Sequence, residues 1–161
     1  MRVLSSEAAP ICAIRVLLDD YTACLDRDEL ERWPEFFVPD GIYKVLSREN
    51  VERGLSAPLI YYYSRGMMRD RVTALRDALT YEFVYTRHLV SGTQIARLSD
   101  GAYRVTSTFA IYQSTEEGVT RLFCVGGYED RVAMTPDGPC FAERTVVVDT
   151  FGVLNLIAVP L

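Results

Sequence analysis

The spacing of apolar residues changes between the two halves of this chain, and that change limits the folds open to it. In the first half apolar residues recur at intervals of three and four, the period of a helix buried on one face. In the second half they alternate with polar residues, the period of a strand buried on one face. Because the two patterns are segregated, the sequence predicts an α+β fold and not a series of βαβ units.

Three helical segments are expected in the first half. The first begins between Ser6 and Pro10, because proline is tolerated only in the first turn of a helix. A short second helix begins near Asp28, where Asp28 and Glu31 have capping-box spacing, and Pro34 disrupts it. The third covers Ser64 to Leu79. The apolar stripes of the first and third helices are Ile11, Ile14, Leu18, Tyr21 and Leu25, and Met68, Val72, Leu75 and Leu79.

Turn signals divide the remaining sequence into strands. The tripeptide Pro39-Asp40-Gly41 predicts a turn into a strand over residues 42–47. Further strands are expected at about residues 88–98, around Tyr103 to Tyr112, and over residues 119–132 and 141–149. The pair Gly126-Gly127 inside a long strand suggests a bulge or a sharp bend. The expected product is a curved antiparallel meander with the helices packed on one face.

Length and charge narrow the class of protein. With 161 residues the chain fits a single domain spanning 1–161. The net charge is −5, and Lys44 is the only lysine, so nucleic acids and anionic membranes are poor candidates for partners. We find neither an apolar run long enough for a membrane span nor a secretory signal, and we expect a cytoplasmic protein.

The chain offers few metal ligands. His88 is the only histidine, whereas a mononuclear iron site of the two-histidine type and a Rieske cluster each need two. A zinc site with three histidines is excluded for the same reason. The four cysteines form no C-x-x-C pair, so we interpret Cys12, Cys24, Cys124 and Cys140 as buried, reduced thiols. We therefore assign no catalytic, cofactor-binding or metal-binding residue.

Three features stay open to more than one interpretation. His88 is either a satisfied strand residue beside Arg87 or a general base with Asp or Tyr partners. Three consecutive tyrosines, Tyr61 to Tyr63, cannot share one face of a regular element, so some are exposed, lie under a loop or contact a partner. The apolar stretch from Phe151 to Leu161 either adds to the sheet, caps the core or docks on another subunit.

Two motifs resemble a known family. The run W-P-x-F-F-x-x-D-G-x-Y, from Trp33 to Tyr43, is followed by R-D-R-V-x-x-L-R, from Arg69 to Arg76. Both resemble the small (β) subunits of Rieske-type aromatic-ring-hydroxylating dioxygenases, as do Arg87-His88 before a strand and the apolar ending. The resemblance covers nearly the whole chain, and the relatives that act on terephthalate or salicylate look most similar.

The resemblance implies a fold, a set of partners and a division of labour. The fold is a cone like that of nuclear transport factor 2, with N-terminal helices packed on a curved antiparallel sheet. In this family a large (α) subunit carries the Rieske 2Fe-2S cluster and a mononuclear iron, and electrons arrive from NADH or NADPH through a reductase. The small subunits form a trimer within a mixed hexamer.

Two functions of different kinds follow. The first is a non-catalytic small subunit supporting an oxygenase that degrades an aromatic, carboxylated compound, with the charged helix Arg69 to Asp77 and the strand ends touching the large subunit. The second is a free-standing isomerase or dehydratase of the same fold, using His88 as general base with Asp19 and a tyrosine. A pure binding module is a third option.

Overall fold

The computed structural model describes residues 8–55, 57–77, 84–149 and 160–161. One hydrophobic core joins the helices and the strands, as an α+β domain requires. The elements, in chain order, are α1 (Ala8–Asp26), the 3₁₀ helix η1 (Leu30–Phe36), β1 (Phe37–Ser47), α2 (Arg48–Glu52), β2 (Ile60–Tyr62), α3 (Arg65–Asp77), β3 (Tyr85–Arg97), β4 (Tyr103–Ser114), β5 (Thr120–Thr135) and β6 (Gly138–Val148).

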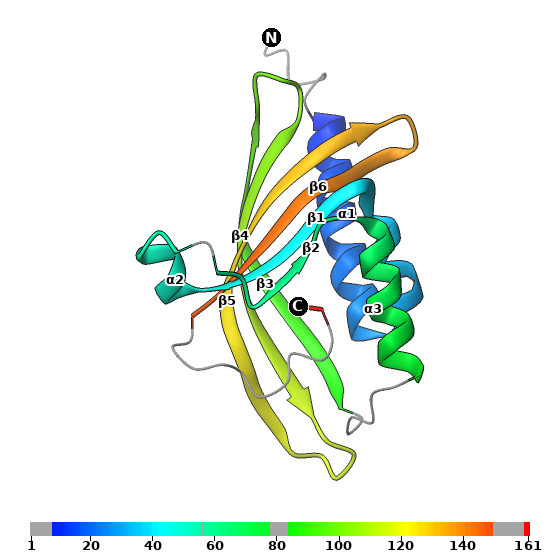
Figure 1. Ribbon diagram of the computed structural model, residues 1–161, viewed down its shortest axis with the longest axis vertical. Helices are drawn as coiled ribbons and strands as arrows, with labels where there is room; N and C mark the ends of the chain where they lie inside the picture. The colour runs from blue at the N-terminus through cyan, green and yellow to red at the C-terminus, as the bar shows by residue number, and fades with distance from the viewer. Residues whose placement is uncertain (1–7, 56, 78–83, 150–159) are drawn as a thin grey trace.

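The sheet has six strands in the order β2-β1-β6-β5-β4-β3. Strands β3 to β6 form the expected antiparallel meander, and β2 is antiparallel to β1. Strand β1 runs parallel to β6, a pairing between distant parts of the chain that the sequence pattern did not indicate. Figure 1 shows the strongly curved sheet with α1 and α3 on one side, which confirms the predicted cone of helices against a curved sheet.

Helix α1 follows the predicted period closely. Its start at Ala8 falls within the expected interval, and Ile14, Leu18, Tyr21 and Leu25 are buried, while Ile11 is half-buried. Helix α3 buries Met68, Val72 and Leu75 as expected, and the predicted Leu79 lies outside the described residues. Within the described part of the chain, no helix is both long enough and apolar enough to span a membrane.

The second helix differs from the prediction. It is a 3₁₀ helix that contains Pro34, and its N-cap position, Glu29, makes no capping hydrogen bond. The capping box expected of Asp28 and Glu31 is wrong, because both carboxylates bond to Arg76 on α3. Asp28 also has a φ of 56°, a left-handed conformation that Asp tolerates better than most residues.

Strand β1 begins earlier than expected. The predicted turn at Pro39-Asp40-Gly41 is wrong, because the strand runs through these residues from Phe37. The pairing with β6 changes register between Phe37 and Ile42, so the turn-like residues form an irregularity within the strand. Pro39-Asp40-Gly41, expected to precede the strand as a turn, therefore form an irregular part of β1 itself.

The inward and outward faces of β4 follow the predicted alternation. Tyr103, Val105, Phe109 and Ile111 are buried, whereas Thr108 and Tyr112 face outward. Of the two alternatives expected at Gly126-Gly127, a bulge or a sharp bend, the bulge is wrong, because both glycines pair in register with β4 and β6. The register of β4 and β5 changes at Phe123, which lies opposite the step from Ile111 to Tyr112.

Gly126 is glycine because another strand approaches it closely. An added Cβ would lie 2.8 Å from Phe109 Cζ and well within the van der Waals contact distance of the Val147 carbonyl oxygen, which is backbone and cannot turn aside. We expect Gly126→Ala to destabilise the chain by roughly 1–3 kcal/mol, the usual cost of overpacking. Urea unfolding measures it, and Gly127→Ala is the matched control because its Cβ would meet nothing closer than 3.4 Å. Equal stability of the two variants would contradict the close approach.

The last two residues are part of the core. Pro160 and Leu161 are buried, and the Leu161 N–H donates to Tyr43 Oη at 2.9 Å. Tyr21 Oη donates to the Leu161 carbonyl oxygen at 3.1 Å. For these two residues the core-capping interpretation is confirmed, and the rest of the apolar stretch lies outside the described residues.

Candidate functional site

The polar centre of the core is a buried ion pair. Asp130 on β5 and Arg144 on β6 are cross-strand neighbours whose side chains both point inward. Arg144 Nε and Nη2 donate to the two carboxylate oxygens of Asp130 at 3.0 and 3.1 Å. The guanidinium carbon lies 4.1 Å from the ring centroids of Tyr21 and Tyr128. Burial raises the pKa of Asp130 to about 6, although Arg144 opposes this shift.

Sequence reasoning missed this pair, but a signal was present. Asp130 falls between Tyr128 and Val132 on the buried face of an alternating strand, where a charged residue breaks the pattern. Such a residue is rarely buried without a partner of opposite charge. Searching the inward face of the neighbouring strand for an arginine would have identified Arg144.

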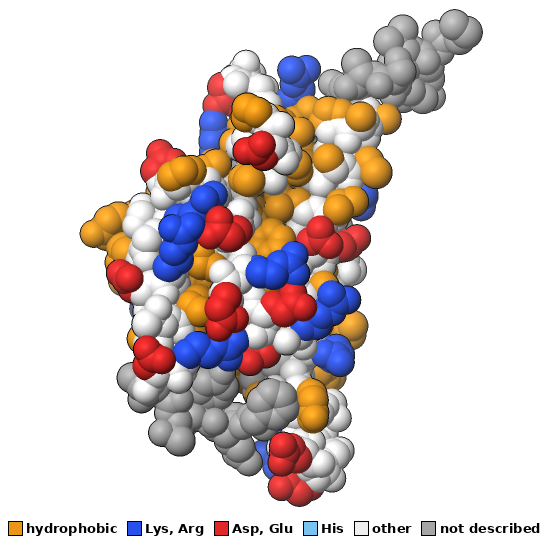
Figure 2. Space-filling view, turned by 90° about the vertical axis from the view of Figure 1, so that its right-hand side faces the viewer, with side chains coloured by type: hydrophobic (Ala, Val, Ile, Leu, Met, Phe, Trp, Pro, Cys, Tyr) orange, Lys and Arg blue, Asp and Glu red, His pale blue; other side chains and the backbone are white. Residues whose placement is uncertain are grey.

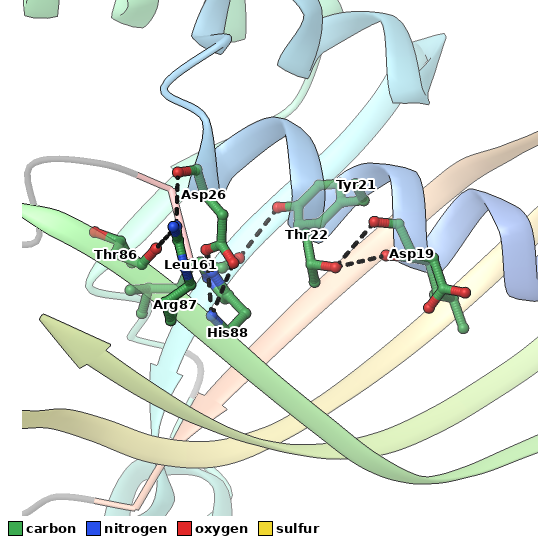
Figure 3. A network of polar contacts seen from close by, with 9 residues as sticks. Asp19, Tyr21, Thr22, Asp26, Thr86, Arg87, His88 and Leu161 are labelled. Carbon is green, nitrogen blue, oxygen red and sulfur yellow. Dashed lines mark hydrogen bonds and ion pairs between the residues drawn. The ribbon is translucent and has the colours of Figure 1, made fainter.

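His88 is held by the end of α1 and not by the residue expected (Figure 3). Its Nδ1 lies 2.6 Å from Asp26 Oδ1, and its backbone N–H donates to both Asp26 oxygens at 3.2 Å. Asp19, the predicted partner, lines the same cleft as His88, but no hydrogen bond joins the two. The hydroxyls of Tyr21 and Tyr43 bond to Leu161. A His–Asp pair of this kind can orient an imidazole or simply anchor β3 to α1.

A cleft of about 500 Å³ opens between α1 and the β3–β4 edge. Asp19 and Thr22 contribute from α1, and His88, Val90 and Phe109 from the sheet. The His88 side chain is only 1% exposed, so its ring lies at the inner wall. The cleft brings together polar and apolar groups but places no nucleophile beside an activating base.

The potential metal ligands are dispersed. Among the residues that the structure describes, no three His, Cys, Asp or Glu side chains are grouped to hold a metal ion. All four cysteines are free thiols, and burial raises the pKa of Cys24 to about 11 and that of Cys124 to about 12. The expectation of burial is confirmed for these two, is wrong for the exposed Cys12, and holds only in part for Cys140.

Arg65, Arg69 and Arg76 of α3 form ion pairs within the chain. Figure 2 shows basic and acidic side chains interleaved on the face that carries the helices. Arg76 donates to Glu31 and Asp28, each at 2.7 Å, and Arg76 holds the pKa of Glu31 below its usual value. Arg69 donates to Glu35 at 2.7 Å. These pairs fasten α3 to η1, so the charges do not require another subunit.

The three consecutive tyrosines, two in β2 and one directly after it, differ in burial. Tyr62 stacks on Tyr43 with ring centroids 6.1 Å apart, whereas Tyr61 and Tyr63 are exposed. Their outward rings lie 6.3 Å from each other. The prediction that some of these rings are exposed is confirmed. Exposed apolar side chains on nearby segments are Val51, Leu55 and Leu59.

A second apolar surface lies on the outward face of the opposite edge of the sheet. Leu89 on β3 pairs with Ala110, and Tyr112 on β4 pairs with Leu122 on β5. Leu89 is 59% exposed and Leu122 is 54% exposed, although leucines in strands are normally covered. We call Tyr85, Leu89, Tyr112 and Leu122 the outer patch. Large exposed apolar patches on proteins often mark interaction sites.

Comparison with known proteins relates the chain to one group. The family model described as ring hydroxylating beta subunit matches residues 22–154. The small subunit of anthranilate 1,2-dioxygenase from Burkholderia cepacia is 36% identical over 92% of each chain. A terephthalate 1,2-dioxygenase beta subunit from Comamonas sp. is 34% identical over 88% of this chain and 92% of its own length. A crystal structure of a beta subunit, assigned to an aromatic-ring-hydroxylating dioxygenase of Novosphingobium aromaticivorans, covers 97% of this chain and 99% of its own, at 35% identity and a TM-score of 0.85.

Proposed function

The chain belongs to the family of ring-hydroxylating beta subunits, and from that membership we propose that it is the non-catalytic small subunit of an aromatic-ring oxygenase. The observation that carries the proposal is the match along nearly the whole chain to small subunits of such enzymes. The free-standing isomerase or dehydratase is not favoured, because the matched family is one of oxygenase subunits. In this reading His88 anchors β3 to Asp26.

The substrate of the complex is an aromatic carboxylate. The named relatives act on anthranilate and terephthalate, and both are single rings that carry a carboxylate. From the family resemblance we propose that the complex uses a Rieske 2Fe-2S cluster, a mononuclear iron and electrons from NADH or NADPH through a reductase. The donor set of this chain does not fit either iron group, because its only histidine is bonded to Asp26. We therefore place both iron groups in the large subunit.

The assembly is a trimer of small subunits within a mixed hexamer. The outer patch supports self-association, since Leu89 and Leu122 expose apolar surface that a neighbouring chain would cover. We assign the large subunit to the surface around Tyr61 and Tyr63 at the other edge of the sheet, because aromatic side chains are enriched in interfaces. The chain acts as one domain, residues 1–161, and its four free thiols suit the cytoplasm.

We expect charge in the outer patch to disrupt the assembly. Leu89→Glu and Leu122→Glu each place an unpaired carboxylate in the proposed interface, which costs roughly 2–5 kcal/mol. That corresponds to at least a thirtyfold weaker association, by the ratio of about 1.4 kcal/mol per factor of ten. Size-exclusion chromatography with light scattering, on the chain alone and co-expressed with its large subunit, measures the effect.

The matched control for these variants is Val16→Glu. Val16 is 53% exposed on α1, on the helix side of the molecule and away from the outer patch. This variant should assemble like the wild type. If Leu89→Glu and Leu122→Glu also keep the wild-type mass, the outer patch is not the interface and the trimer must form elsewhere.

A further inference from the structure

The interior of the cone holds polar atoms without partners. Four such atoms, from different strands, make no hydrogen bond within the described part of the chain: His88 Nε2, Ser107 Oγ, Tyr128 Oη and Arg144 Nη1. Buried polar atoms in native proteins are nearly always hydrogen-bonded, to protein, to water or to a ligand. Of these four residues, His88 and Arg144 also line a cleft or a cavity, so their free nitrogen atoms are the ones that water or a ligand can reach.

Three of these atoms belong to neighbouring strands. Ser107 on β4 pairs with Tyr128 on β5, and both side chains face inward. The Arg144 guanidinium on β6 lies over the Tyr128 ring. Arg144 uses Nε and Nη2 for Asp130, so the free donor is the outer nitrogen of a cation whose side chain is 1% exposed. The cluster offers one charged donor and two hydroxyls.

A cavity reaches one member of this cluster, Arg144. It has a volume of about 280 Å³ and is lined by Arg144 together with Arg15, Leu18, Asp19, Val90 and Gly92. Its lining includes the bulge of β3, where the pairing with β4 shifts between Ser91 and Gln94 and Gly92 has a φ of 65°. Asp19, Thr22, Val90 and Ser91 also line the cleft of His88, so the two spaces adjoin. Figure 3 shows Asp19 and Thr22 on α1 beside β3.

The chemistry of the lining selects the ligand. The free guanidinium nitrogen of Arg144 is a donor that suits a carboxylate. Arg15 adds a second positive charge to the lining, against the single negative charge of Asp19. Leu18 and Val90 form apolar walls that suit a flat ring. The volume of about 280 Å³ lies just below the range of small-molecule sites, roughly 300–1,000 Å³, so the ligand is small.

We propose that this cavity binds a single-ring aromatic carboxylate, with the carboxylate on Arg144 and the ring between Leu18 and Val90. The choice of a ring acid rests on the proposed function, whereas the cavity and its free donors stand without it. The small subunit then binds the same class of compound that its complex degrades, at a site of its own. It holds the acid without reacting with it, so no bond is made or broken there.

Titration calorimetry on the full-length chain tests the proposal with benzoate, and with benzamide as the neutral analogue of the same shape. Benzoate should bind, and benzamide should bind at least about tenfold more weakly because it lacks the charge that Arg144 recognises. Thr22→Phe, which fills the mouth, should abolish binding. Arg15→Gln should weaken it about two- to fivefold, the usual effect of one exposed charge. Arg53→Gln, at the C-cap of α2, is the matched control and should bind benzoate like the wild type.

Three results would each overturn the proposal that the cavity binds an aromatic carboxylate. No heat with benzoate at about 10 mM, ten times a dissociation constant of about 1 mM, would overturn the proposal. So would binding that Thr22→Phe leaves unchanged, or a crystal structure with benzoate present that shows only water on Arg144 Nη1. None of these readouts needs the large subunit. If benzoate does not bind, the assignment as an oxygenase subunit is unaffected. If that assignment is wrong, the binding measurement on this chain is still valid.

Discussion

Trp33→Ala should lower the free energy of unfolding by roughly 3–5 kcal/mol, the range for large aromatic residues removed from a core. Trp33 is completely buried, and its ring makes edge contacts with Phe37, Tyr43 and Tyr62. Its Nε1 donates to Tyr21 Oη at 3.1 Å, so the substitution leaves both a cavity and a weakened hydrogen-bond chain to Leu161. Trp33 thus joins η1, β1, β2 and α1.

Thermal unfolding of the isolated chain measures this loss, with an expected decrease in Tm on the order of 10 °C. Tyr63→Ala is the matched control, because it removes an aromatic ring that is 61% exposed. It should change the Tm little. If the Trp33→Ala variant had the same Tm as the Tyr63→Ala variant, Trp33 would not anchor η1.

Arg144→Met should be about as damaging, at roughly 3–5 kcal/mol, because it leaves the buried carboxylate of Asp130 without its partner. The double variant Arg144→Met, Asp130→Leu removes both charges and should recover most of the loss, since an apolar pair of similar volume can replace a buried ion pair. Chemical unfolding of the wild type, both single variants and the double variant gives the coupling between the two residues. Purely additive losses would contradict a coupled pair.

The effect of Arg144→Met should also depend on pH. Burial already raises the pKa of Asp130 to about 6, above the ordinary value of about 3.9 in an unfolded chain. Loss of the guanidinium raises the folded-state pKa further. A raised carboxyl pKa contributes stability at low pH that is lost as the pH rises through the folded-state value. The destabilisation by Arg144→Met should therefore be small near pH 5 and large near pH 8, and the reverse order would exclude this mechanism.

The sequence predicts a helix or strand well where the periodic spacing of its apolar residues is set by burial of one face. Helix α1 buries Ile14, Leu18 and Tyr21, as the three-and-four spacing predicted. Strand β4 alternates as expected because one face is core and the other is not. Periodicity succeeds in both because burial of a single face sets the pattern.

Where local rules failed, distant partners decided the outcome. Asp28 and Glu31 have the spacing of a capping box, but Arg76 on α3 offers both carboxylates a stronger, charge-assisted bond. The turn residues Pro39 to Gly41 stay within β1 because β6, about a hundred positions later, supplies a parallel neighbour. Neither partner is visible in a local window of sequence.

The polar interior was the least accessible to sequence reasoning. His88 was identified as a candidate, but its partner is Asp26 and not Asp19, because the end of α1 sits against β3. Side chains alternate between the two faces of a strand, so an offset of one residue moves a side chain from the inward to the outward face. The bulge at Gly92 in β3 introduces such an offset. Such bulges follow from packing of the whole sheet.

The central claim is that chemistry takes place in the large subunit while this chain supports it. The most direct test is steady-state turnover of an aromatic acid by the complex of this chain, its large subunit and a reductase, with His88→Asn replacing the wild type. Asparagine can still donate to Asp26 but cannot act as a base. We predict that the chain alone consumes no oxygen, that the complex hydroxylates the ring, and that His88→Asn keeps kcat within about twofold. Losing a general base costs on the order of a hundredfold or more, so a decrease of that size with assembly intact would contradict the account.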